Sequence, residues 1–120
     1  MNVSLSLDRL VEKIKCHSDF DKVGMIACHL GVVRGSSRQG QPVKRMEVRV
    51  NQKVIREIID EAKREPGIIE ILVEVQEGVL RVGESVMAVA VAGDFREHVF
   101  PVLERVVNLI KQKAVLKKEE

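Results

Sequence analysis

Apolar residues recur along the chain with two different spacings, and the spacing separates expected helices from expected strands. A first helix over about 7–16 is predicted by apolar residues at helical spacing, namely Leu7, Leu10, Val11 and Ile14. Val23 to Val33 is an apolar run without a helical phase, which predicts a strand ending at Arg34. The Gly-, Ser- and Pro-containing segment 35–42 predicts a loop. In Val43 to Val50, apolar and charged residues alternate, which is typical of a half-buried strand.

The second half of the chain repeats this mixture of spacings. Asn51 can cap a helix whose apolar stripe is Val54, Ile55, Ile58, Ile59 and Ala62, and Pro66-Gly67 ends it. Two strands are then predicted, over 68–75 and 85–92, with Gly78 and Gly83 marking a turn between them.

The last helix is predicted from a capping pattern and a long apolar stripe. Asp94-Phe95-Arg96-Glu97 has the form of a capping box, with an acidic N-cap and Glu three residues later. The stripe runs to about Lys113 and consists of Val99, Leu103, Val106, Val107 and Ile110. Lys117 to Glu120 reads as a charged tail.

The expected order is helix, strand, loop, strand, helix, strand, strand, helix. Strands mixed with helices, two of them joined by a short turn, predict an α+β fold with a largely antiparallel sheet. The chain has 120 residues, a length that suits one hydrophobic core, so we expect residues 1–120 to form a single domain.

Composition narrows the classes of protein that this chain can belong to. Its hydrophobic fraction of 45% is that of a globular protein, so disorder is excluded as the main state. The longest uncharged apolar run has strand length, and the first residues lack a secretory pattern, so we expect a cytoplasmic protein without a membrane segment. A net charge of +2 is too small to indicate nucleic-acid binding by itself, and 2% aromatic residues argue against a base-stacking surface.

Motifs for several kinds of chemistry are missing from the sequence. Cys16 and Cys28 lack CxxC spacing, and we expect both to be reduced thiols, although a disulfide stays open. His17, His29 and His98 are scattered, so we expect no metal site and no cofactor. No P-loop, GxGxxG or GxSxG is present, which disfavours nucleotide, dinucleotide and serine-hydrolase chemistry.

The positive signal is a set of cations near the ends of the expected elements. Arg34 ends the first strand, Arg96 begins the last helix, and Lys111 and Lys118 lie seven residues apart around its end. In a continuous helix that spacing would place both amines on one face. Cations that converge on a cleft would suit a phosphate or carboxylate ligand, but a lysine near a helix C-terminus also complements the helix dipole without any function.

Residues 24–119 also contain an ordered series of short segments found in one protein family. The segments are Gly24-Met25-Ile26, Leu30-Gly31-Val32-Val33-Arg34, Ile58-Ile59-Asp60-Glu61-Ala62, Gly78-Val79-Leu80-Arg81-Val82-Gly83-Glu84, Val89-Ala90-Val91, Arg96-Glu97-His98-Val99-Phe100, Leu109-Ile110-Lys111 and Lys117-Lys118-Glu119. In order and spacing this series resembles the large, catalytic subunit of molybdopterin synthase.

The resemblance implies a fold, an activity and partners. The fold would be an α/β hammerhead, and the large subunits would form a homodimer within a heterotetramer. A small ubiquitin-like sulfur carrier would insert its C-terminal Gly-Gly tail, activated as a thiocarboxylate, into a pocket of the large subunit. The substrate that receives the sulfur would be cyclic pyranopterin monophosphate. By position, Lys111 and Lys118 correspond to the family's active-site lysines, and Arg34 and Arg96 to its substrate-binding arginines.

The chain departs from the family pattern at several positions. Phe95 precedes Arg96 where the family has a histidine, and Val75-Gln76 replaces a second His-Arg pair. Arg49 to Gln52 replaces an aromatic-rich segment, and Val115-Leu116-Lys117 stands where the family has proline, an aromatic residue and tryptophan.

Two alternatives to the sulfurtransferase follow from these observations. A homologue that lost catalysis could use the same fold to bind a ubiquitin-like protein tail or another phosphorylated ligand. An unrelated protein could instead contact a nucleic-acid backbone through the cations of the basic loop region, which are Arg34, Arg38, Lys44, Arg45 and Arg49.

Overall fold

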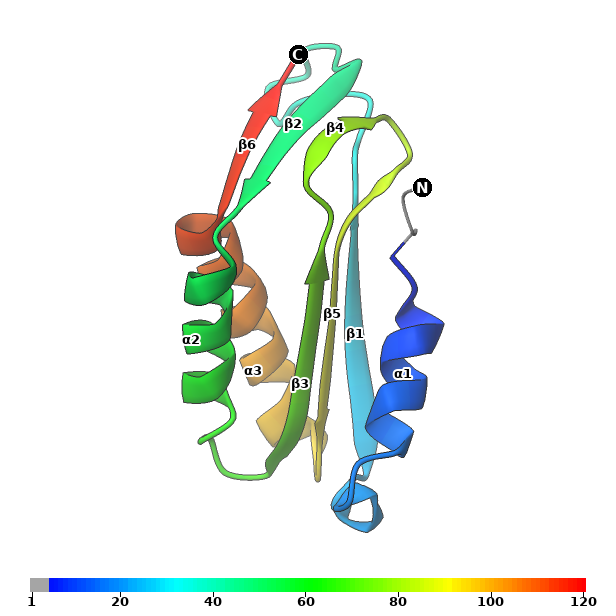
Figure 1. Ribbon diagram of the computed structural model, residues 1–120, viewed down its shortest axis with the longest axis vertical. Coiled ribbons are helices and arrows are strands. Elements are labelled where there is room, and N and C mark those ends of the chain that lie inside the picture. The colour runs from blue at the N-terminus through cyan, green and yellow to red at the C-terminus, as the bar shows by residue number, and fades with distance from the viewer. Residues whose placement is uncertain (1–4) are drawn as a thin grey trace.

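The central strand of the protein is buried on both faces and organises the layers around it. The computed structural model describes residues 5–120. Strand β5 (Ser85–Gly93) lies between β1 (Met25–Val32) and β3 (Ile68–Val75), and both neighbours pair with it antiparallel. Helix α1 (Leu7–Lys15) covers one face of this sheet, while α2 (Gln52–Ala62) and α3 (Arg96–Leu109) lie on the other (Figure 1).

Alternate residues of β5 pack against different layers. Ala88, Ala90 and Ala92 face Leu10 and Ile14 of α1, and all three alanines are fully buried. The small side chains let the helix approach the sheet closely. The residues between them, Met87, Val89 and Val91, belong to the larger core shared with α2 and α3. Met87 and Val89 therefore face a core and not a dimer partner.

A second, smaller sheet extends this larger core at one end of the molecule. It consists of β4 (Gly78–Arg81), β2 (Arg45–Val50) and β6 (Val115–Glu119), with β2 in the middle and antiparallel to both neighbours. Its buried residues join the core of α2 and α3; they are Met46, Val48, Leu80 and Val115. Figure 1 shows β2 and β6 side by side beyond the ends of the two helices.

The α+β fold with antiparallel sheets is as predicted, and most expected elements occur. Asn51 caps α2 as expected, because its Oδ1 accepts a hydrogen bond from Val54 N at 3.2 Å. A short 3₁₀ turn, η1 (Phe20–Lys22), follows α1. Two strands were missed: β4 in the expected turn and β6 in the expected charged tail. Both are short, and their backbone groups are satisfied by β2, a partner distant in sequence.

The expected capping box is wrong. The N-cap of α3 is Phe95, whose side chain makes no capping bond. Asp94 Oδ1 instead accepts hydrogen bonds from Phe95 N at 2.6 Å and from His98 Nδ1 at 2.7 Å. A capping box needs the backbone N–H of its N-cap to bond with the Glu side chain. Asp94 N instead donates to the carbonyl of Gly67 at 2.9 Å, which ties Asp94 to the preceding turn.

The end of the last helix also differs from the expectation. The α-helix ends at Leu109, and its continuation over Ile110–Ala114 is a π turn, η2. Ile110 and Ala114 are buried, and the Ala114 carbonyl accepts a hydrogen bond from Asn51 N at 2.8 Å. The chain then leaves as β6, so Lys111 and Lys118 do not share a helix face.

Packing of α1 on the alanine face of β5 can be tested by truncation. Ile14→Ala should lower the free energy of unfolding by about 2–5 kcal/mol, because Ile14 is fully buried between α1 and the sheet. Leu116→Ala, at a side chain that is 74% exposed, is the control and should change it by no more than about 0.5 kcal/mol. Urea unfolding measures both, and equal effects would contradict the packing described for α1.

Candidate functional site

A wide hollow lies between the two sheets, where the chain leaves β1 and enters β6. Its volume is about 700 Å³. We call it the basic groove; its lining residues are Val32, Arg34, Ser36, Arg38, Gln39, Met46, Lys111, Val115, Lys117 and Glu119. Four cationic side chains thus face one carboxylate across a partly apolar floor.

The loop that carries Arg34 and Arg38 is fixed by backbone hydrogen bonds. Val33 is buried and bonded in both directions to the turn before β5, through Glu84 O and Gly83 N. Arg34 follows directly, and its Nε donates to Ser36 O at 2.8 Å. Across the loop, Ser37 N donates to Gln41 O at 2.8 Å. These bonds hold both arginines on one wall of the groove.

The opposite wall comes from the π turn and β6. Lys111 lies in the π turn, and strand alternation brings Val115, Lys117 and Glu119 of β6 to the groove side of the second sheet. None of the ion pairs among residues 5–120 involves the four groove cations. These charges are therefore available to an anionic ligand.

Electrostatics within the groove distinguish Lys117 and a histidine beneath it. Desolvation lowers the pKa of Lys117, and the positive charge of Lys111 lowers it further. Desolvation also lowers the pKa of His29 on β1, with added repulsion from Lys111 and Lys117. The buried His29 Nε2 has no hydrogen-bond partner among the described residues. A neutral imidazole thus lies near two ammonium groups.

The structure brings together two of the four predicted site residues in one protomer. Arg34 and Lys111 both line the groove. Lys118 pairs with Glu47 in the ladder and lies on the other face of the second sheet, beside a smaller hollow of about 290 Å³ that Lys117 also borders. Lys117, which the sequence analysis treated as tail, takes the groove position.

Arg96 lies at the far end of α3 from the groove. The helix has 14 residues, which corresponds to about 20 Å of helix length between Arg96 and the π turn. Arg96 is exposed and its Nε lies 3.4 Å from a carboxylate oxygen of Glu97. The expectation that four cations share one hollow is therefore not met within a single protomer.

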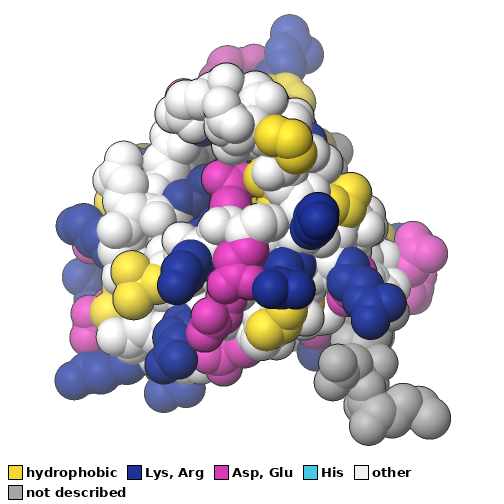
Figure 2. Space-filling model, turned by 90° about the horizontal axis from the view of Figure 1, so that it is seen from above, with side chains coloured by type: hydrophobic (Ala, Val, Ile, Leu, Met, Phe, Trp, Pro, Cys, Tyr) yellow, Lys and Arg dark blue, Asp and Glu magenta, His cyan; other side chains and the backbone are white. Residues whose placement is uncertain are grey.

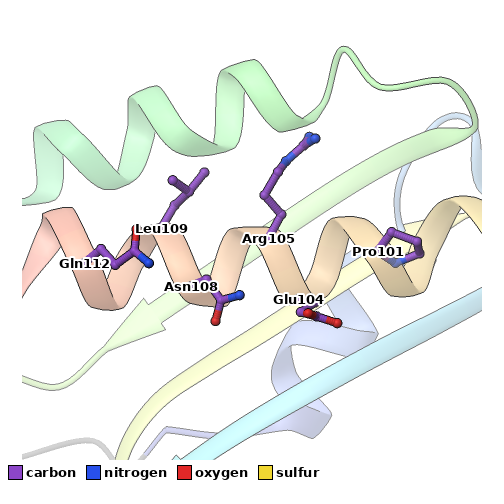
Figure 3. A pocket seen from close by; sticks show the side chains of 6 residues that line it. All are labelled: Pro101, Glu104, Arg105, Asn108, Leu109 and Gln112. Carbon is purple, nitrogen blue, oxygen red and sulfur yellow. The ribbon is translucent and has the colours of Figure 1, made fainter.

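A second hollow, on α3, lacks comparable chemistry. It has a volume of about 380 Å³, and its lining residues are Pro101, Glu104, Arg105, Asn108, Leu109 and Gln112. Figure 3 shows Arg105 and Leu109 pointing toward α2, and Arg105 is paired with Glu65 at 3.1 Å. Its one cation is neutralised, so this hollow is a weaker candidate for an anion site.

The cations proposed for nucleic-acid binding do not form a continuous surface. Arg45 is paired with Glu120, and Arg49 with Glu47. Seen from the end that carries the second sheet, Lys and Arg side chains are interspersed with Asp and Glu side chains (Figure 2). The acidic neighbours disfavour contact with a phosphate backbone.

Residues 5–120 contain neither a cluster of metal-binding side chains nor a helix that could span a membrane. No group of three or more His, Cys, Asp or Glu side chains there is placed to hold a metal ion. No helix in that part of the chain has the length and apolar character needed to cross a bilayer.

Comparison with known proteins identifies the family. A family model described as "MoaE protein" matches residues 2–113. The chain belongs to the MoaE family. This is the family of the molybdopterin synthase large subunit, which acts in molybdenum cofactor biosynthesis. The match includes Arg34, Arg96 and Lys111 but ends before β6.

Two relatives are similar to this chain over most of its length. An uncharacterized protein of Methanocaldococcus jannaschii is 28% identical over 110 residues, 88% of each chain. The molybdopterin biosynthesis MoaE protein of Burkholderia ambifaria is 27% identical, with a TM-score of 0.80 over 98% of this chain and 78% of that one.

Two more distant structures share the fold. Molybdopterin synthase from Staphylococcus aureus is 20% identical with a TM-score of 0.80, over 98% of this chain and 85% of that one. In a complex of subunits 1 and 2 of the Helicobacter pylori molybdopterin-converting factor, the matching chain is 15% identical with a TM-score of 0.73. The match covers 97% of this chain and 79% of that one.

The Asp94–His98 contact at the start of α3 predicts an acid-sensitive stability. The hydrogen bond from His98, followed by that from Phe95 N, lowers the pKa of Asp94. A carboxyl whose pKa is lower in the folded state stabilises the fold above its unfolded pKa, about 4, and loses this contribution as the pH falls through the folded value.

Asp94→Asn should therefore lower the melting temperature at neutral pH, with a difference from the unmodified protein that shrinks toward about pH 3. Asp60→Asn, on the exposed side of α2, is the control and should show little effect. A difference for Asp94→Asn that stays constant over this range would show that the Asp94 charge is not responsible.

Proposed function

We propose that this protein is the catalytic subunit of a molybdopterin synthase. It would transfer sulfur from the thiocarboxylated C-terminus of a small ubiquitin-like subunit to cyclic pyranopterin monophosphate. The observation that carries the proposal is the basic groove, in which unpaired cations face each other in a chain of the MoaE family. The Helicobacter pylori complex of two subunits supports a small protein partner.

The charges of the groove suit the two reactants. A thiocarboxylate and a phosphorylated pterin are both anions, so they repel each other unless cations lie between them. Arg34 offers a planar donor group suited to phosphate, and Lys111 a point charge on the opposite wall. Met46 and Val115 add buried apolar surface to the groove, which lowers the local polarity and strengthens these interactions.

The remaining predicted residues keep their roles as proposals. Lys111 would stabilise the charge that develops at the tail carbonyl, and Arg34 would bind the substrate phosphate. Lys118 corresponds by position to the family's second lysine, and a catalytic role for it stays a prediction. Phe95 stands where the family has a histidine, so this chain lacks that imidazole. A non-catalytic binding module is therefore the second candidate function.

The direct experiment combines the purified protein with a thiocarboxylated small partner and the pterin precursor. Appearance of the dithiolene product supports the synthase. Formation of a complex without product supports the binding module. Absence of both contradicts the two proposals together.

Lys111→Ala should lower the turnover of this reaction by about 100-fold or more, because it removes a cation from the reacting groups. Lys113→Ala is the matched control, since Lys113 belongs to the same π turn but does not line the groove. Single-turnover sulfur transfer measures both variants. Similar rates for the two variants would remove Lys111 from the mechanism.

Arg96 can serve the groove only if a second copy supplies it, so the proposed homodimer bears on the site. β1 is an edge strand whose outer side is unpaired among the described residues, and Leu30 and Val32 on it are exposed. It runs from the α3 N-terminus, where Met25 pairs with Gly93, to Arg34 at the groove. A twofold axis across β1 would place Arg96 of one copy near Arg34 of the other.

Mixed dimers test this arrangement. Co-expressed Arg96→Ala and Lys111→Ala chains should recover about a quarter of the activity, because half of the dimers are mixed and each of those contains one complete groove. Lys111→Ala mixed with Arg34→Ala should recover none, since both residues come from the same protomer. Recovery in both mixtures, or in neither, would contradict a shared site.

A further inference from the structure

Two adjacent lysines on β6 lie in different surroundings. Opposed residues of an antiparallel pair share a face of the sheet, and successive residues alternate between faces. Lys117 pairs with Val48, a buried core residue, whereas Lys118 pairs with Glu47. Lys117 therefore shares the groove face with Val115 and Glu119, and Lys118 lies on the outer face with Leu116.

We propose that Lys117 is a further active residue of the basic groove, an acid–base amine that works beside Lys111. The inference deepens the function proposed above and rests on it for the reaction concerned. It concerns a position where the family has tryptophan, so it is a property of this chain. The family match also ends before this residue.

The charged groups around Lys117 are mostly cationic. Lys117 makes no ion pair among residues 5–120. Glu119 is the one carboxylate in the groove, and its effect, which raises the pKa of Lys117, is smaller than the opposing effects of desolvation and Lys111. β2 offers only apolar side chains, Met46 and Val48, on this face. On the groove side, the titratable or charged groups around Lys117 are Lys111, Arg34, Arg38, His29 and Glu119. In the smaller hollow that Lys117 also borders, they are Glu47, Arg49 and Lys118.

This environment makes the Lys117 ammonium group easier to deprotonate than that of a fully solvated lysine. The Lys117 side chain has an exposed part, but the groove walls desolvate its ammonium group, and Lys111 repels the charge. A lysine near another cation loses its proton more readily than a solvated one and then acts as a base. In a turnover, the neutral Lys117 Nζ would accept a proton from the bound substrate and return it to the product, so that the amine ends unchanged.

Acylation of the protein tests the amine without any substrate. Acetic anhydride at limiting concentration modifies neutral amines, and mass spectrometry of the digested protein reports each lysine across about pH 6 to pH 10. Lys117 should react at lower pH than Lys118. In Lys111→Met, the pH at which Lys117 reacts should rise. Equal pH dependence for the two lysines, or no change in Lys111→Met, would overturn the proposal.

Turnover of the reconstituted synthase tests the role in sulfur transfer. Lys117→Ala and Lys117→Arg should both lower the rate by about 100-fold, because arginine keeps the charge but does not release a proton. Lys113→Arg is the matched control and should keep the rate, because Lys113 is exposed on the π turn and does not line the groove. Full activity of Lys117→Arg would reduce Lys117 to a cation and overturn the acid–base role.

The two experiments separate the possible failures. If the unmodified protein transfers no sulfur, the proposed function fails while acylation still decides whether Lys117 is the activated amine. If the unmodified protein is active and Lys117→Ala is as active, the function stands and the inference about Lys117 fails. A circular dichroism spectrum and melting temperature like those of the unmodified protein exclude misfolding of the variants.

Discussion

Burial of β5 on both faces is the constraint on which the rest of the structure depends. Its alanine face accepts α1, and its larger face forms the core with α2 and α3. β1 pairs with β5, and α3 follows β5 in the chain. The position of β5 therefore fixes both elements whose ends lead to cations of the groove. Arg34 leaves the end of β1, and Lys111 lies beyond the end of α3. Hydrophobic packing at the centre thus sets the spacing of charges at the periphery.

The groove itself depends on the way the chain leaves α3. The π turn ends the helix with Ile110 and Ala114 both in the core, and β6 then continues as a partner of β2. The register of β6 with β2 determines which of two adjacent β6 side chains faces the groove and which faces outward. A slip of one residue would exchange Lys117 for Lys118, so the pairing of Val48 with Lys117 determines which lysine lines the groove.

Much of this structure could be predicted from sequence spacing, and the failures have physical causes. The stripes of α2 and α3 and the alternation in β2 identified those elements, because each buries one face. β4 and β6 are short and charged, and they exist through pairing with the distant β2, which local patterns do not report. Asp94 looked like a helix cap, but its backbone N–H is bound to Gly67 and its carboxylate to His98.

The candidate site also combines residues that local sequence patterns identified with residues whose positions depend on distant strand pairing. Arg34 and Lys111 were found from their places at element ends and from the family resemblance, and the fold brings them together. Lys117 was missed because a charged tail gives no indication of which side chains face inward. Arg96 and Lys118 correspond to family positions, but sequence alone does not show that one lies at the far end of α3 and the other on the outer face of β6.

We propose above all that the basic groove receives the anionic C-terminus of a small protein partner. Zero-length coupling of the tail carboxylate to nearby amines with a carbodiimide, followed by mass spectrometry, locates that terminus directly. The expected linkage is to Lys111 or Lys117, the two groove lysines. Linkage confined to lysines outside the groove, such as Lys53 on α2 or Lys13 on α1, would contradict the account.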